Sequence, residues 1–299
     1  MALRRHRFAP RRTYQRPDKA SQRSAVQSGH REEASVLGKF TAGSGRVEAT
    51  PNGWRLLVSA SSGYSDAQLD DTQGRARRAL PHRPPLKLLV EARASASSPP
   101  GTLGFGFWND PFPAFAGEAG ARRLLPAMPQ AIWFFYSSPP SELPFAAGGA
   151  GTGWRAASLR SPVWPGAAVA ALGAAAFAAM LFRPLRRTLI PLGWRAVEGA
   201  QSAPIAGLDS WRRYEIDWSV ERARFSVDDR TVLEAVDPPT EALGLVIWID
   251  NQWAALSGGA GLRFGIVPDA SGASLEIRQL SLNGNPIEVA DSKGRGALP

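Results

Sequence analysis

Apolar and polar residues alternate along most of the chain in short runs separated by turn residues. Four such runs lie in the first half, at 53–60, 86–97, 101–112 and 131–138, and two more lie near the end, at 243–250 and 274–284. Runs of this length between turn clusters predict the strands of an antiparallel sandwich rather than βαβ units.

The clearest alternation falls in 211–236, where Tyr214, Ile216 and Trp218 take turns with charged or polar neighbours. A period of two marks a strand with one wet and one buried face, so 212–236 is expected to form a meander. Asp228 and Asp229 stand between two apolar runs. They suit the tight turn of a hairpin, because Asp tolerates left-handed backbone angles.

One stretch, 162–205, breaks this rhythm and predicts an Ala-rich helical insertion. Residues 163–182 carry no charge, and Val169, Leu172, Ala176 and Met180 recur at helical spacing. Its richness in Ala and Gly disfavours a membrane span, and a single span between two strands would leave the halves of one sandwich on opposite sides. Two interpretations stay open: the helix packs on the sandwich or on a partner protein, or 163–199 docks to a membrane surface through its apolar face and the arginines at 183, 186, 187 and 195.

Charge is concentrated at the start of the chain. The net charge is +9, and residues 1–31 hold nine Lys or Arg against one acid, Asp18, which places +8 of it there. Specific nucleic-acid binders usually carry their basic patch on the folded module, so this class is disfavoured. We expect a basic disordered tail over 1–35, a sandwich over 36–285 and a C-terminal tail over 286–299. The tail lacks the apolar core of a signal peptide, which favours a cytoplasmic protein, membrane-associated if the insertion docks there.

Several kinds of chemistry are excluded or weakened by the residues present. The chain has no cysteine, which rules out disulfides, thiolate metal sites and cysteine nucleophiles. His82 is the only histidine outside the tail, so histidine metal sites and Ser-His-Asp triads lack their parts. Asp70 and Asp71 are interpreted as turn residues. No cofactor is expected, although carboxylates here or at Asp110 or Asp250 could hold structural calcium.

Several segments resemble family-16 glycoside hydrolases such as laminarinases and lichenases. LKLLVEARAS is similar to a family strand that carries an acid and Arg, and GTLGFGFWNDPF to the Gly-rich strand ending in a Trp, here Trp108. WRRYEIDWSVERARFSVDDRTVL resembles the late meander, and LGLVIWIDNQWA the strand after it. The resemblance covers about 150 residues in the right order. It implies an all-β, antiparallel jelly-roll β-sandwich of the concanavalin A-like kind, with the helical insertion added.

The family's catalytic strand has no counterpart in this chain. Its Glu-x-Asp-x-x-Glu pattern supplies two carboxyls about 5 to 5.5 Å apart for retaining hydrolysis. The matching segment here is AIWFFYSS, and no acid occurs from Ala119 to Ser141. We therefore lean towards a noncatalytic or degenerate relative of these hydrolases.

Aromatic and polar residues at strand ends and centres form the candidate ligand site on the concave face. A sugar needs flat apolar surfaces for its ring and a few polar groups for its hydroxyls. The candidates that offer both are Trp108, Asn109, Asp110, Trp133, Phe135, Tyr136, Asp250, Asn251, Gln252 and Trp253. On 131–138, Trp133 and Phe135 share one face and Tyr136 lies on the other, and the sequence does not say which face points inward. The alternatives are a hydrolase with relocated acids, such as Asp110 with Asp250, and a scaffold whose insertion docks elsewhere.

Overall fold

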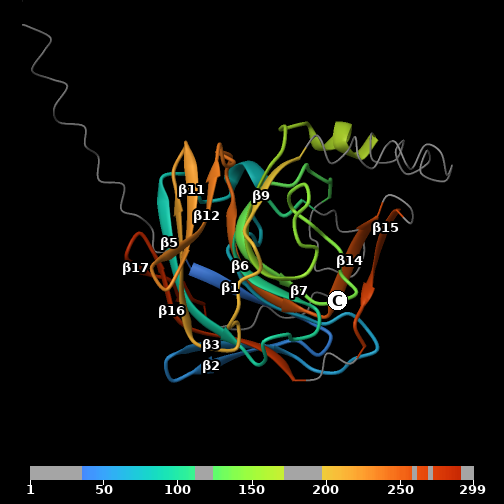
Figure 1. Ribbon diagram of the computed structural model, residues 1–299, viewed down its shortest axis with the longest axis vertical. Coiled ribbons are helices and arrows are strands. Elements are labelled where there is room, and N and C mark those ends of the chain that lie inside the picture. Colours follow the sequence, from blue (N-terminus) through green and yellow to red (C-terminus); the bar gives the residue numbers. More distant parts are fainter. Residues whose placement is uncertain (1–35, 112–123, 172–196, 258–260, 269–271, 291–299) are drawn as a thin grey trace, which may run out of the picture. The chain divides into compact units, whose positions relative to one another are not determined.

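The computed structural model describes residues 36–111, 124–171, 197–257, 261–268 and 272–290. These described residues all belong to one compact unit. Within it, the described strands make two large sheets that pack face to face and a separate two-stranded hairpin, which confirms the predicted all-β sandwich (Figure 1). The basic tail lies outside the described residues.

Sheet 1 has the strand order β18-β1-β4-β13-β6-β7-β8-β9. Its strands are β1 (Val36–Ala42), β4 (Asp66–Asp70), β6 (Thr102–Trp108), β7 (Ala131–Ser137), β8 (Gly153–Arg160), β9 (Glu198–Gln201), β13 (Gly244–Asp250) and β18 (Glu288–Val289). All neighbours in this sheet pair antiparallel except β1 and β18, which run parallel.

Sheet 2 has the order β12-β11-β10-β5-β16-β3-β2, with β17 paired to β16. Its strands are β2 (Arg46–Thr50), β3 (Gly53–Val58), β5 (Leu86–Ala94), β10 (Arg212–Trp218), β11 (Arg222–Val227), β12 (Arg230–Val236), β16 (Ala273–Leu282) and β17 (Asn285–Pro286). A short 3-10 helix, η1 (Arg77–Ala79), precedes β5. The third element is the hairpin of β14 (Gln252–Ser257) and β15 (Gly261–Ile266), which projects on the side away from β11 and β12 (Figure 1).

Alternate residues of the facing strands fill the space between the sheets. Tyr214, Ile216 and Trp218 of β10 are buried there, as their period of two predicted. Asp228 and Asp229 join β11 to β12 with φ of 48° and 64°, which is the left-handed turn expected of them. Burial of these apolar side chains, each contributing about 1.5 to 3 kcal/mol, is the main stabilising force of the sandwich.

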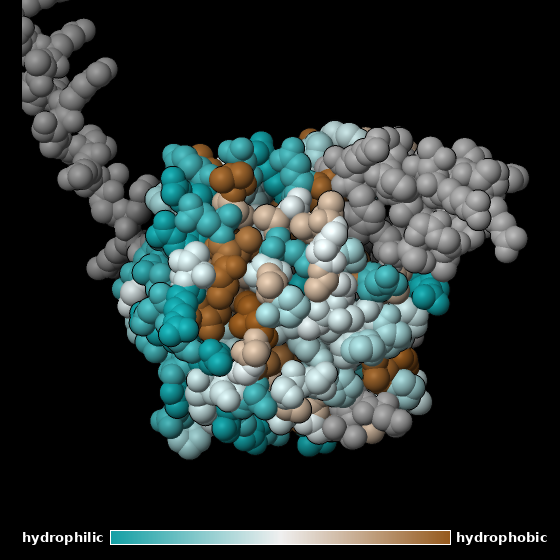
Figure 2. All heavy atoms as spheres, in the orientation of Figure 1, coloured by the Kyte–Doolittle hydropathy of each residue, from teal (hydrophilic) through white to brown (hydrophobic). Residues whose placement is uncertain are grey.

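The outer edge of sheet 2 mixes charged and apolar residues. β12 is the edge strand, and its Glu234 forms ion pairs with Arg222 and Arg224 of β11. Val236 at its end is 77% exposed, and Figure 2 shows a strip of hydrophobic residues among hydrophilic ones near β12. Charges along an edge strand hinder pairing with another chain.

The predicted insertion is described only at its two ends. A helix occupies residues 166–171, after Pro165 accepts the first backbone hydrogen bonds, and the chain is next described from Val197. The range 162–205 therefore also contains β9, which extends sheet 1 by pairing with β8. Likewise, the predicted C-terminal tail contains β18, which pairs with β1.

Candidate functional site

The outer face of sheet 1, turned away from sheet 2, carries a second apolar cluster. On β7, Phe134 and Tyr136 point into the inner core, whereas Trp133 and Phe135 point outward. The outward members of the neighbouring strands complete what we call the outer-face cluster. They are Ala131, Trp133, Phe135, Phe145, Ala157, Leu159, Val246 and Trp248, with Trp108, Leu143 and Val197 packed against them.

Three indoles of this cluster lie in a row, which we call the tryptophan row. The ring centres of Trp108 and Trp133 are 6.1 Å apart, and those of Trp133 and Trp248 are 5.5 Å apart. Distances of this size are typical of interacting aromatic pairs. Trp133 and Trp248 are each 8% exposed, while Trp108 is half-buried at the end of the row.

Glycines on β6 make room for the tryptophan row. In the sequence GFGFW, Phe105 and Phe107 point into the inner core, so Gly104 and Gly106 face outward. A Cβ on Gly104 would lie 2.6 Å from Cη2 of Trp248, and one on Gly106 would lie 2.7 Å from Cβ of Trp133. The indoles thus lie directly on the backbone of β6.

A buried arginine holds the loop between β7 and β8 over the cluster. Arg155 is 0% exposed and donates hydrogen bonds to the carbonyls of Leu143, Gly151 and Gly153. Its guanidinium also lies 4.9 Å from the ring centre of Phe145. No carboxylate of the described chain pairs with it, and burial lowers its pKa to about 10. Carbonyl dipoles and aromatic faces therefore hold this charge and fix Leu143 and Phe145 on the outer face.

The indole nitrogen of Trp133 is a buried donor without an acceptor. Nε1 makes no hydrogen bond to the described chain, although the side chain is more than nine-tenths buried. Buried donors are nearly always paired, so an orphan within an aromatic surface calls for an explanation.

Polar groups border the tryptophan row at the end of β13. Nε1 of Trp248 donates to Oγ1 of Thr102, which donates to Oδ1 of Asp250 at 2.8 Å. Burial raises the pKa of Asp250 to about 7, against the lowering effect of hydrogen bonds from Gln252 and Thr102. The β-sheet register places Asp66 of β4 directly opposite Asp250. Gln68 lies two residues further along β4, opposite Trp248.

The other predicted site residues lie in three different places. Tyr136 belongs to the inner core, and its hydroxyl bonds to Ser98. Asn109 and Asp110 follow β6 at the far end from Asp250: Asn109 binds the backbone of Met128 and Gln130, and the carbonyl of Asp110 accepts Arg77. Asn251 is fully buried, and its side chain forms hydrogen bonds with the backbone of Gly63 and Ser65. Gln252 and Trp253 are the first two residues of β14 in the hairpin.

The structure thus brings together Trp108, Trp133, Phe135 and Asp250 on one face, and separates the remaining candidates from it. Sequence reasoning missed Thr102, Asp66, Gln68, Trp248 and Arg155. The alternation of Asp66, Gln68 and Asp70 in DAQLD was the available signal for a polar outer face on β4.

The described residues contain neither a cluster suited to a metal ion nor a helix suited to span a membrane. Among them, no group of three or more acidic or histidine side chains is arranged to hold a metal ion. No helix among the described residues is long and apolar enough to cross a membrane.

Exposed apolar side chains gather where the insertion begins: Val163 and Trp164 are 68% and 43% exposed, and Leu124 is 85% exposed. The two segments touch, because a Cβ on Gly166 would meet Leu125 at 3.0 Å.

The two facing sheets, whose strands pair almost entirely antiparallel, form a jelly-roll β-sandwich.

No family model matches the chain, and no curated protein matches it. Solved structures similar to it include a legume lectin-like domain from Entamoeba histolytica, with 9% identity, coverage of 82% of this chain and 88% of that one, and a TM-score of 0.43. A glycoside hydrolase family 16 endo-glucanase from Bacteroides ovatus has 10% identity, coverage of 83% and 94%, and a TM-score of 0.43. The carbohydrate-binding module CBM66 from Bacillus subtilis has 9% identity, coverage of 84% and 98%, and a TM-score of 0.38. At such identities the likeness concerns the fold and says nothing of the residues of the site.

Proposed function

We propose that the protein binds a carbohydrate on the outer face of sheet 1 without hydrolysing it. The observation that carries this proposal is the orphan N–H of Trp133, which lies between two further indoles of the tryptophan row. Aromatic faces suit the apolar side of a sugar ring, and an unpaired donor suits a hydroxyl oxygen. Asp250 and Thr102 add polar groups at one end of the row.

Access to this face passes through the loop that Arg155 holds. Leu143 and Phe145 cover Trp133 and Phe135, while Trp108 stays half-exposed at the rim. A sugar would first contact Trp108 and would reach the N–H of Trp133 when the loop moves outward.

Binding to a glycan array followed by calorimetry tests the proposal. Trp133→Phe keeps an aromatic ring but removes the N–H donor together with part of the indole surface, so we expect the dissociation constant to rise at least about tenfold, the effect of one lost hydrogen bond of about 1.4 kcal/mol. Trp108→Ala should weaken binding more, and Trp253→Ala asks whether the hairpin contributes. Trp164→Phe, which lies outside the sheet, is the matched control. A broad panel without any ligand would sink the proposal.

A hydrolase with relocated acids is the second candidate. Asp110 and Asp250 lie at opposite ends of the paired strands β6 and β13. Asp250 pairs with Thr102, and Trp108 at the other end of β6 is six residues away, about 20 Å at about 3.3 Å per residue; Asp110 follows two residues beyond Trp108, too far for either hydrolytic geometry. Asp66 and Asp250 face each other on adjacent strands, and Asp250 has the raised pKa of a general acid. Release of reducing sugar that disappears in Asp250→Asn but persists in Asp110→Asn would support this candidate and reject the noncatalytic one.

Docking to a membrane surface is favoured by one observation, the exposed group of Leu124, Leu125, Val163 and Trp164 beside the insertion. The apolar side chains and the four arginines that follow in the sequence suit an anionic lipid surface. Flotation with vesicles of phosphatidylcholine and phosphatidylserine tests it. Leu124→Ser with Trp164→Ser should abolish flotation, whereas Phe264→Ser, an exposed aromatic on the hairpin, should not. A deletion of the insertion should end at residue 196, because Val197 packs on the outer-face cluster.

A further inference from the structure

The outer face of sheet 2 carries a polar groove that none of the preceding functions uses. Two hollows of about 440 and about 410 Å³ lie on this face, and both are lined by Arg55 and Glu276. They therefore adjoin each other on either side of that pair. Volumes of this size fall within the range of ligand sites.

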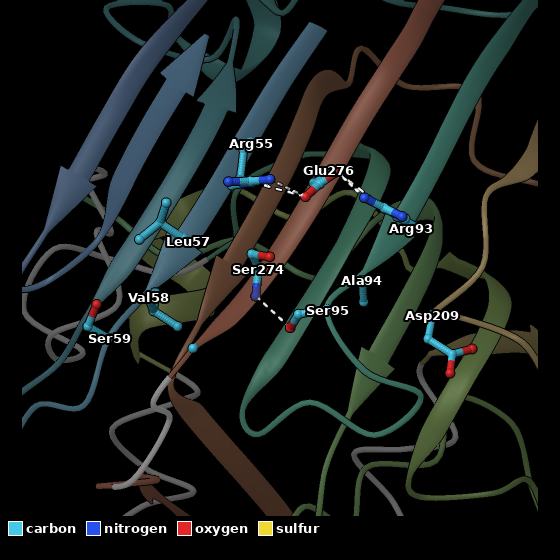
Figure 3. Close-up of a pocket in the computed structure, with 11 residues that line it drawn as sticks. Arg55, Leu57, Val58, Ser59, Arg93, Ala94, Ser95, Asp209, Ser274 and Glu276 are labelled. Atoms are coloured by element: carbon cyan, nitrogen blue, oxygen red, sulfur yellow. Dashed lines mark hydrogen bonds and ion pairs between the residues drawn. The ribbon is translucent and has the colours of Figure 1, made fainter. Parts of the chain in front are cut away.

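The floor of the groove follows from the strand register. Glu276 of β16 lies opposite Arg55 of β3 on one side and Arg93 of β5 on the other, with all three side chains outward (Figure 3). Arg55 donates to Oε1 at 2.7 Å and Arg93 to Oε2 at 3.0 Å. Burial raises the pKa of Glu276 less than these two arginines lower it. One carboxylate thus holds two guanidinium groups in fixed positions.

Both arginines retain donors for a ligand. Arg55 and Arg93 each bind Glu276 through Nε and Nη2, and neither Nη1 has a partner in the described chain. The carboxylate of Asp209 and the side chains of Ser95 and Ser274 line the same hollow (Figure 3). Donors whose orientation is already fixed lose little entropy when they bind.

Trp211 supplies an aromatic surface in the second hollow. It lies just before β10, and its ring centre is 4.9 Å from the guanidinium of Arg93 and 4.5 Å from that of Arg278. Arg278 is in turn held by Glu91. Two cation-π contacts therefore fix the position of a half-buried indole beside Asn52 and Thr50.

The charges of the groove balance. The two hollows are lined by Arg55, Arg93 and Arg278 and by Glu48, Asp209 and Glu276. A polyanion would meet as many carboxylates as guanidinium groups, whereas a neutral polyol can use both as hydrogen-bond partners. We propose that this groove is a second site, which binds a neutral glycan chain across β2, β3, β16 and β5 with Trp211 as its stacking platform. It stands independently of the tryptophan row, which lies on the other sheet.

Calorimetry with neutral hexasaccharides of β-1,3-glucose, β-1,4-glucose and β-1,4-mannose, with dextran sulfate as the anionic comparison, tests the proposal. We expect at least one neutral hexasaccharide to bind, its dissociation constant to rise tenfold or more in Trp211→Ala and in Arg93→Met, and dextran sulfate to bind no better. Arg224→Met is the matched control, because Arg224 pairs with Glu234 on the same face outside the groove. Preference for dextran sulfate, or a neutral ligand bound equally by Trp211→Ala and the unaltered protein, would overturn the proposal.

Hydrogen exchange keeps the two sites distinguishable and does not depend on the variants folding. In the unaltered protein, the bound hexasaccharide should slow amide exchange in 50–58 and 272–279. Protection confined to 131–137 and 244–250 would place the ligand on the tryptophan row and reject the groove. Trp133→Phe should leave groove binding unchanged, so failure of one site does not imply failure of the other.

Discussion

Nε2 of His82 lies 2.5 Å from Oδ2 of Asp71, and both side chains are 4% exposed. Oδ1 of Asp71 also accepts the backbone N–H of Leu245, and the ring of His82 packs edge-on against Phe107. The pair therefore connects the end of β4, the segment before β5 and the start of β13. Two residues that appeared unrelated in the sequence form a buried junction of sheet 1.

Removing this junction should destabilise the fold. Asp71→Ala leaves His82 and the N–H of Leu245 without their acceptor, so we expect the free energy of unfolding to fall by about 3 kcal/mol. Chemical denaturation monitored by tryptophan fluorescence measures it. Asp229→Asn is the control, because Asp229 forms an exposed ion pair with Arg213 and Asn tolerates its positive φ. Its effect should stay below about 0.5 kcal/mol, and an equal loss in both variants would contradict the assignment.

Gly104→Ala tests the packing of the tryptophan row on β6. The added Cβ would lie 2.3 Å from the carbonyl oxygen of Phe134 and 2.6 Å from Cη2 of Trp248, so the strand or the indole must shift. We expect a loss of about 3 kcal/mol and a changed tryptophan emission spectrum. Gly63→Ala, where the nearest atom is 4.0 Å away, should be close to neutral. If Gly104→Ala changed neither the stability nor the emission spectrum, Trp248 would not lie on β6.

Arg155→Met should loosen the loop over the outer face. Met fills part of the space but cannot donate to the carbonyls of Leu143, Gly151 and Gly153, so amide exchange across 143–151 should quicken at least tenfold. Arg155→Lys should act in the same direction, because an ammonium group cannot reproduce the planar fork. Arg160→Met, on the exposed end of the same strand, is the control. If the loop covers the ligand, Arg155→Met should also raise affinity for a sugar on the tryptophan row, and a fall would contradict that role.

The stability of the fold should depend on Asp250 in a pH-specific way. Its pKa is about 7 in the folded chain, against an ordinary 3.8. Between these values the folded state binds a proton that the unfolded state has lost, so this carboxyl destabilises the fold increasingly as pH rises from about 4 to about 7. Asp250→Asn keeps an acceptor for Thr102 and Gln252 without the charge. It should add up to about 4 kcal/mol to the free energy of unfolding at pH 8, at about 1.4 kcal/mol per pKa unit, and little at pH 4.

Denaturation at both pH values measures this difference. Asp217→Asn, which removes the charge of an exposed acid on β10, is the control variant measured alongside. The same gain at both pH values in Asp250→Asn would show that the carboxyl is not protonated in the folded chain near neutrality.

The strands of sheet 2 were predicted well because one of their faces is wet. Tyr214, Ile216 and Trp218 alternate with charged neighbours, which predicts a strand with one wet and one buried face. The structure confirms the predicted meander of β10, β11 and β12. Strands such as β4 and β8 were missed. The outer face of β4 is largely covered although it carries the polar residues Asp66, Gln68 and Asp70, and β8 (GWRAASLR) has mostly small side chains. Neither strand therefore shows the alternation of exposed polar and buried apolar residues that predicts a strand.

The faces of sheet 1 could not be assigned from sequence for a related reason. Every residue of β7 is buried, because the inner core lies on one side and the outer-face cluster on the other. Alternation groups Trp133 with Phe135 but does not say which side they take. The same limit applies to Asp71 and His82, whose contact depends on the meeting of two loops.

The place of β16 in sheet 2 has a consequence for how the chain folds. This strand lies between β3 and β5, although more than 170 residues separate it from β5 in the sequence. Until residues 273–282 leave the ribosome, β3 and β5 each present an unpaired edge, and sheet 2 exists as two fragments. Contacts between such distant segments slow folding and expose edges that favour aggregation. The nascent chain therefore completes its sandwich only after residues 273–282 have been synthesised, and a chain truncated before residue 273 should need a chaperone to stay in solution.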